Sequence, residues 1–197
     1  PIVSAALRSG DVLAATEVIP DESLALVGLA EQARITIVDT PKAAPEPFDP
    51  REGSAGLTLT AAAPVVGEGG AVVGAVMVGH LFNNDFSIVD RIKEVAGVDT
   101  ATIFFGDLRV STNVLGAEGE RAVGTRVSQE VRDVVLVEGA GYTGPAYVVN
   151  ENFITRYEPL RNHQGQIVGM LYVGARQASF LNLVNELDAR ILVIALG

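Results

Sequence analysis

The sequence predicts an α+β protein built on antiparallel β-sheets. Short β-branched runs are separated by glycine-containing turns, and amphipathic segments follow the paired runs. The chain also repeats itself at a displacement of 95 residues: a strand with a proline, a turn glycine, a second strand with glycine near each end, then an amphipathic helix. The matched residues include Pro64 and Pro159, Gly70 and Gly165, Gly74 and Gly169, and Gly79 and Gly174.

Chance agreement between two hairpins is the alternative, because Gly and Val are abundant, but tandem related units explain the repeat better. In the first half we expect short helices over residues 2–29, a strand over 34–39, and an exposed loop from the proline-rich stretch that follows. A hairpin over residues 56–80 and a helix over 84–95 complete this half.

The second half is predicted to contain a tight hairpin over residues 100–112, a helix over 128–137 and three further strands over 142–149, 152–160 and 166–174. A last helix should begin near Ala178. The strand expected at Ile35 lies 66 residues before the one at Ala101, which differs from the 95-residue displacement. The first copy is therefore expected to be shortened or degenerate.

Composition excludes several functions. The formal charge is −10 and the pI is about 4.6, so the chain lacks the clustered positive charge that binds nucleic acid. There is no cysteine, which excludes a disulfide framework, a thiolate zinc site and a cysteine nucleophile. The charge-free apolar residues 191–197 fit either a last buried helical turn or the beginning of a transmembrane helix.

The patterns of a catalytic site are weak. His80 ends a strand and His163 lies in a turn, so neither is placed as the base of a Ser-His-Asp triad. The glycines at 67–70 precede a strand and lack the lysine of a phosphate-binding loop. The carboxylates are dispersed. We therefore expect no enzyme activity, no metal site and no cofactor.

The hairpin at residues 100–112 and the segment from Tyr157 to Gly174, with its Pro159, Gly165, Gly169 and Gly174, resemble the Cache (PAS-like) sensor domains of bacterial chemoreceptors and sensor histidine kinases. The middle segments at 120–125 and 141–146 resemble the single-Cache type. The resemblance covers residues 99–187 well and 56–92 more loosely. The long N-terminal helix typical of that family is not evident.

The resemblance implies a PAS-like, five-stranded antiparallel sheet flanked by helices, preceded here by a degenerate Cache-like repeat. It divides the chain into a degenerate module at 1–97, a complete ligand-binding module at 98–187 and the start of a transmembrane helix at 188–197. It also implies a periplasmic domain of an inner-membrane receptor for chemotaxis or other signal transduction, held by flanking transmembrane helices and dimeric in the full receptor.

The expected ligand is a small organic acid such as acetate, because a fixed guanidinium beside an apolar wall suits a carboxylate. Arg109 matches the arginine of the related citrate-sensor pattern, where a histidine follows three residues later; here Thr112 stands in its place, which suggests a less charged acid. Strand alternation and the resemblance, in which Tyr142 would lie in the loop over the pocket, give the candidate ligand-binding residues Phe104, Arg109, Ser111, Thr112, Tyr142, Thr155, Arg156, Tyr157 and Tyr172.

Other interpretations stay open. Each tyrosine could be a core residue with a satisfied hydroxyl, and Arg109 could be a solvated hairpin residue paired with Asp107. The whole chain could be a free-standing hydrolase or isomerase that uses dispersed carboxylates, or a partner-binding Cache module without a small-molecule ligand.

Overall fold

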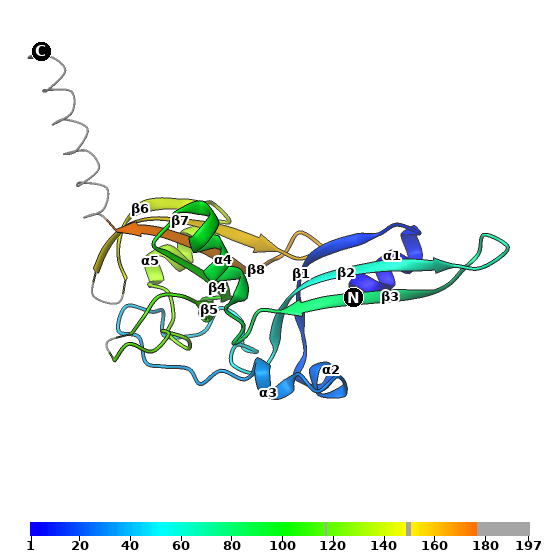
Figure 1. The fold of residues 1–197 in the computed structure, drawn as a ribbon, viewed down its shortest axis with the longest axis horizontal. Coiled ribbons are helices and arrows are strands. Elements are labelled where there is room, and N and C mark those ends of the chain that lie inside the picture. Colours follow the sequence, from blue (N-terminus) through cyan, green and yellow to red (C-terminus); the bar gives the residue numbers. More distant parts are fainter. Residues whose placement is uncertain (117, 149–150, 177–197) are drawn as a thin grey trace, which may run out of the picture.

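Two antiparallel β-sheets form the framework of the protein. The computed structural model describes residues 1–116, 118–148 and 151–176 of the 197. The first sheet has the strand order β1-β2-β3, and the second has the order β5-β4-β8-β7-β6. The first sheet projects away from the more compact region that contains the second (Figure 1). The predicted α+β class with a five-stranded antiparallel sheet is confirmed.

The first sheet begins with α1 (Ile2–Ser9) and β1 (Leu13–Ile19). Two short helices, α2 (Asp21–Leu26) and α3 (Ala30–Ala33), precede the long hairpin of β2 (Gly56–Val66) and β3 (Val72–Leu81). The expectation of helices alone over residues 2–29 is wrong at β1. This segment pairs along its whole length with β2, and that pairing overrides the mixed helical spacing of its apolar residues.

The second sheet contains β4 (Thr100–Phe105), β5 (Leu108–Thr112), β6 (Tyr142–Val148), β7 (Glu151–Arg161) and β8 (Ile167–Arg176). The amphipathic helix α4 (Ser87–Ala96) packs on one face through Val89 and Ile92. The other face is covered by α5 (Gln129–Arg132) and the π-helical segment η1 (Asp133–Val137). All of these elements lie close to the predicted ranges.

The 95-residue repeat is retained in the hydrogen-bond register of the two hairpins. β2 and β3 have the same lengths and bounds as β7 and β8 once 95 is added to each number. Thr60 pairs with Gly79 as Thr155 pairs with Gly174, and both ladders shift register at the equivalent position near the turn. The turn glycines, Gly70 and Gly165, both have φ 79°. Two unrelated hairpins would not be expected to agree at this level.

The repeat extends upstream at a second displacement, 129 residues, that the sequence did not reveal. β1 and β6 have equal lengths, and Leu13 pairs with Ala62 as Tyr142 pairs with Tyr157. Buried Ile2 and Ala6 of α1 correspond to buried Val131 and Val135 of α5 and η1. The left-handed glycines that follow correspond as well, Gly10 to Gly139. The first sheet therefore matches the last three strands of the second sheet.

The two displacements differ by 34 residues because β1 and β2 are joined by residues 20–55, whereas β6 ends at Val148 and β7 begins at Glu151. Part of this connection, residues 34–55, lies against the second sheet; we call it the strap. The strand expected over 34–39 is wrong, since these residues have no regular structure. The expected loop is present, but it is only partly exposed, because Ala44 and Glu52 are buried.

The predicted helix from Ala178 and the predicted start of a transmembrane helix at 188–197 lie outside the described residues. Among the helices of the described ranges, none has the length and apolar character needed to cross a bilayer.

Candidate functional site

A row of hydroxyl-bearing side chains crosses the second sheet from edge to edge. Neighbouring strands place the following residues opposite one another in turn: Tyr142, Tyr157, Tyr172, Thr102 and Thr112. Because side chains alternate between the two faces of a strand, all five lie on the face covered by α5 and η1. Tyr142 begins strand β6 and is thus not in a loop over the site.

The adjacent row on the same face contains Met170, Phe104 and Arg109. A β-bulge between β4 and β5 makes this possible, because the register shifts after Ile103. The extra residue in β5 turns Arg109 and Thr112 to the same face although they are three positions apart. Arg109 therefore lies beside the tyrosine row instead of pointing to solvent from the hairpin.

The Arg109 guanidinium is buried without a partner for two of its nitrogens. The residue is 5% exposed, and neither Nε nor Nη1 has a hydrogen-bond partner within the described residues. The guanidinium carbon lies 5.1 Å from the centroid of the Phe104 ring. Asp107 pairs with other arginines, so the interpretation of Arg109 as its surface partner is wrong.

The pKa directions reflect the burial of one cation beside the tyrosine hydroxyls. Burial lowers the pKa of Arg109, against the opposing influence of the Tyr157 and Tyr172 hydroxyls. Burial raises the pKa of Tyr157 and, to a smaller extent, that of Tyr172. The Tyr172 hydroxyl lies 2.9 Å from Oγ1 of Thr100. All of these tyrosines are therefore neutral at physiological pH, and Arg109 supplies the only charge among them.

Apolar side chains close this region. Val131, Val135 and Leu136 of α5 and η1 pack over the sheet in one cluster with Tyr157 and Tyr172, and Phe48 of the strap packs against that cluster. The ring centroids of Tyr157 and Tyr172 are 4.8 Å apart, and those of Tyr142 and Tyr157 are 5.9 Å apart. We call Arg109 and this lining of Phe104, Tyr142, Tyr157 and Tyr172 the Arg109 site.

Three other predicted residues have different surroundings. Thr155 is buried on the same face, and its hydroxyl donates to the carbonyl of Gly144 at 2.9 Å. Ser111 lies on the opposite face and donates to the carbonyl of Asp85. Arg156 also lies on the opposite face of β7, exposed and bonded to Glu158 and Thr143. The structure thus brings Phe104, Thr112 and the tyrosines to Arg109, but not Ser111 or Arg156.

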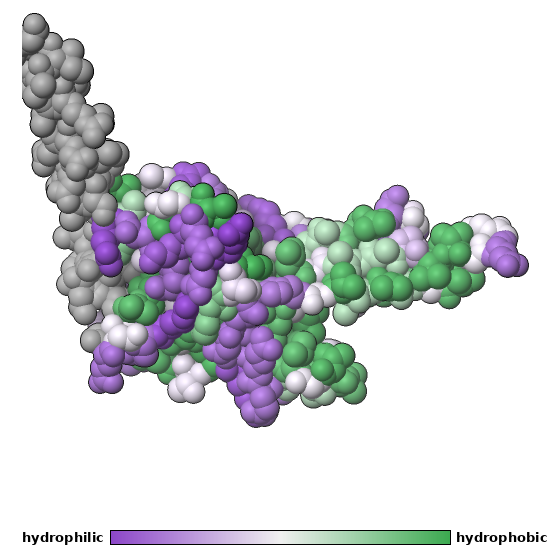
Figure 2. Space-filling view, in the orientation of Figure 1, coloured by the Kyte–Doolittle hydropathy of each residue, from purple (hydrophilic) through white to green (hydrophobic). Residues whose placement is uncertain are grey.

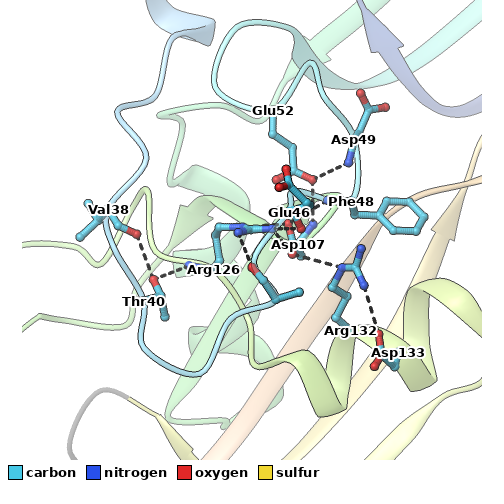
Figure 3. A network of polar contacts seen from close by, with 11 residues as sticks. Val38, Thr40, Glu46, Phe48, Asp49, Glu52, Asp107, Arg126, Arg132 and Asp133 are labelled. Carbon is cyan, nitrogen blue, oxygen red and sulfur yellow. Dashed lines mark hydrogen bonds and ion pairs between the residues drawn. The ribbon is translucent and has the colours of Figure 1, made fainter.

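A buried polar network beside the hairpin turn was not found from the sequence (Figure 3). The Asp107 carboxylate is fully buried and bonds to the Arg126 guanidinium at 2.7 Å and 3.2 Å. Arg132 lies 3.4 Å from the same carboxylate and 5.7 Å from the Phe48 ring. Arg126 also donates to the carbonyls of strap residues Ala44 and Glu46. The network fastens the strap to the β4–β5 turn and to Arg126, which precedes α5.

Glu52 of the strap completes this network. Its Oε1 accepts the backbone N–H groups of Asp49 at 3.0 Å and Asp107 at 3.2 Å. Burial, reinforced by the neighbouring Asp107 carboxylate, raises the pKa of Glu52 to about 9. Glu52 is therefore protonated at neutral pH. The only sequence signal for this contact was the density of prolines and acidic residues in the strap, which does not identify a buried partner.

A surface cleft of about 690 Å³ lies elsewhere, where the first sheet meets the β7–β8 turn. Glu17 and His163 line it and bond to each other, with Nδ1 of His163 2.7 Å from Oε1 of Glu17. In this cleft Glu17 is paired with His163 and Asp49 with Arg51, whereas two nitrogens of the buried Arg109 guanidinium have no partner within the described residues. Over the described ranges, no cluster of three or more His, Asp or Glu is arranged to hold a metal ion.

Comparisons with known structures give distant likenesses. The crystal structure of the E. coli DcuS sensor domain is 10% identical over 50% of this chain and 71% of that chain, with a TM-score of 0.41. The periplasmic domain of Vibrio cholerae LuxQ is 18% identical over 77% of this chain and 59% of that chain, also with a TM-score of 0.41. No curated protein sequence matches the chain.

The family comparison is decisive. The family described as "Single cache domain 3" matches residues 80–187, more than half of the chain. This range contains all five strands of the second sheet, the helix α4 and every residue of the Arg109 site. The protein is therefore a Cache sensor domain and belongs to the single Cache domain 3 family.

Proposed function

We propose that this chain is the extracytoplasmic sensor domain of a bacterial transmembrane receptor, and that it binds a short monocarboxylate such as acetate at Arg109. The observation that carries the proposal is the buried guanidinium with two unpaired donor nitrogens. A buried charge without a partner is strongly unfavourable, and a carboxylate is the group that satisfies a guanidinium best, through two parallel hydrogen bonds. In this domain, residues 98–187 are the ligand-binding module and residues 1–97 a related module that precedes it.

The chemistry of the lining favours a small, singly charged acid. Arg109 is the only cation of the site, and the Thr102 and Thr112 hydroxyls are already paired with each other at 2.6 Å. Phe104 and Met170 offer an apolar wall beside the guanidinium. A methyl or short alkyl group suits that wall, while a second carboxylate would be buried without a cation.

Ligand binding would act on the receptor through β8. Tyr172 lies in the site and on the strand that leads to residues 177–197, so a change at the tyrosine row is transmitted directly to the chain that follows. We assign residues 188–197 to the start of a transmembrane helix and expect the full receptor to be a homodimer, with chemotaxis as one output.

The test is calorimetric titration of acetate into the wild type, Arg109→Ala and Arg109→Lys. Removal of the cation should weaken binding by about 2–5 kcal/mol, and lysine should give an intermediate loss because it lacks the bidentate fork. Arg156→Ala is the matched control, since Arg156 is exposed on the opposite face. Equal affinities in all four proteins would contradict the proposal. The absence of heat with any short acid in the wild type would favour the partner-binding alternative.

A second measurement needs no ligand. If Arg109 is retained for binding, its replacement by Met, which is apolar and of similar length, should stabilise the ligand-free protein by roughly 1–4 kcal/mol. Urea denaturation in acetate-free buffer would measure this. A loss of stability of that size would instead make Arg109 a structural residue.

A further inference from the structure

The free edge of β3 in the first sheet is a candidate interface. β3 is the outer strand in the order β1-β2-β3, and none of the described strands pairs with that edge. Its sequence from Val72 to Leu81 contains no proline and no Asp, Glu, Lys or Arg. Edge strands of soluble proteins normally carry such residues, because a bare apolar edge pairs with other chains. β3 therefore has the composition of a strand that is hydrogen-bonded to a neighbour on both of its edges.

The repeat shows what covers the equivalent edge. β8 corresponds to β3, and β4 pairs with it antiparallel over the six residues from Gly169 to Gly174. The equivalent six residues of β3 are Gly74 to Gly79. In the second sheet, a Cβ added to Gly169 would clash with the carbonyl oxygen of Phe104. At Gly74 nothing lies within 4 Å of that position. The glycine is present in both copies, but only one copy has the strand that requires it.

The outer face beside this edge is also uncovered. Val76 and Val78 are 57% and 63% exposed. Their equivalents, Leu171 and Val173, pack in the cluster that contains Val89 and Ile92 of α4. Hydrophobic side chains line the projecting sheet in the space-filling view (Figure 2). A helix equivalent to α4 would cover this face.

We propose that the β3 edge and this outer face bind a helix followed by a two-stranded hairpin, a unit of the same construction as α4–β4–β5. Its first strand would pair antiparallel with Gly74–Gly79 and be buried on both faces, as β4 is. At the 129-residue displacement Pro1 corresponds to Glu130, and α4–β4–β5 precede Glu130 in the chain. We therefore assign the unit to polypeptide N-terminal to Pro1 in the full-length protein. With it, the first sheet becomes a second five-stranded Cache sheet.

A fusion tests this assignment. Residues 84–129 are repeated directly in front of Pro1, so that the added unit enters at the position it has in the second sheet. Hydrogen exchange of the β3 amides is measured with and without the addition. Amides on the free edge should be protected by roughly 100-fold or more in the fusion, since paired amides exchange only through opening. Unchanged exchange in a folded fusion would overturn the proposal.

Gly74→Ala makes the test specific. In residues 1–197 alone the added methyl group meets open space, so the melting temperature should not change. In the fusion it should abolish the new protection by blocking the incoming carbonyl. Gly69 also faces open space but lies in the hairpin turn. Gly69→Ala should therefore change neither the melting temperature nor the hydrogen exchange of either protein.

Two further measurements keep the proposal falsifiable if the fusion does not fold. Gly74→Ala should lower the melting temperature of the full-length protein while leaving residues 1–197 unaffected; no change in either protein would contradict the proposal. The other molecule that could pair with the β3 edge is a second copy of this chain, and light scattering of residues 1–197 tests for that dimer. If these residues form a dimer that Val76→Lys dissociates, the β3 edge binds a second copy and the assignment is wrong.

Discussion

The two hairpins of this protein share one backbone frame but not one environment. In the second sheet the positions facing α5 and η1 hold Tyr142, Tyr157 and Tyr172, and the equivalent positions of the first sheet hold Leu13, Ala62 and Met77. β4 and β5 then add Phe104 and Arg109 to the second sheet. Both copies thus share the hydrogen-bond register of the hairpin. The candidate site exists only in the second sheet, because only that sheet has the large side chains and the two further strands.

The largest difference between the copies in the effect of a substitution on stability is expected at the equivalent positions 172 and 77. Tyr172 is 1% exposed and packs against Tyr157, while Met77 is 50% exposed. Tyr172→Ala should lower the free energy of unfolding by about 3–5 kcal/mol, because it leaves a cavity and removes the hydrogen bond between the Tyr172 and Thr100 hydroxyls. Met77→Ala should cost about 1 kcal/mol or less. Urea denaturation of both variants would decide, and similar losses would mean that the first sheet is packed more fully than described.

The second-largest difference in stability is expected between substitutions at the equivalent glycines, Gly169 and Gly74. Gly169→Ala forces a methyl group onto the Phe104 carbonyl and should destabilise the protein by about 1–3 kcal/mol, separating β4 from β8. Gly74→Ala in the same chain should be neutral within about 0.5 kcal/mol. Thermal unfolding followed by circular dichroism is sufficient. A neutral Gly169→Ala would contradict the tight approach of β4.

The strap, which has no counterpart in the second copy, should make the protein less stable as the pH rises between about 4.5 and 9. The pKa of Glu52 is raised to about 9 in the folded protein from an ordinary value of 4.5. Its contribution is fully present below pH 4.5 and is lost as the pH rises toward 9, by at most about 1.4 kcal/mol per pH unit. Glu52→Gln keeps a neutral side chain and should flatten this dependence.

Denaturant titrations at pH 6, 7 and 8 would measure the slope for the wild type, Glu52→Gln and the exposed strap control Glu46→Gln. The control should keep the wild-type slope, since the Glu46 carboxylate is exposed. If all three slopes agree, Glu52 is not protonated in the fold.

The smallest effects are expected where the copies agree. Leu59 and Ile154 are equivalent, and both are partly exposed on the outer faces of their hairpins, at 49% and 41%. Replacement of either residue by Thr should change stability by no more than about 0.5 kcal/mol. A large loss at Leu59 in the full-length protein, but not in residues 1–197, would support a covered outer face.

Sequence patterns predicted the second half of the chain well because its elements are local. Tight turns, alternating strands and one amphipathic helix can each be recognised within about a dozen residues. β1 was missed because only its pairing with β2, some 40 residues away, makes it a strand. The buried strap was missed for a similar reason, since Glu52 meets Asp107, and Arg126 meets Ala44, only through tertiary structure. Arg109 was selected from the resemblance, but the bulge that turns it inward has no sequence signature.

The strap also affects how this protein can be divided for expression or for proteolysis. Cleavage between residues 97 and 98 looks natural along the chain, yet it would detach Phe48, Ala44 and Glu52 from the α5 side of the second sheet. Asp107 and Arg126 would then meet water at a surface built to exclude it. The unit that folds as one piece is thus discontinuous in sequence, and a single nick within residues 40–50 would test how tightly its two parts are held.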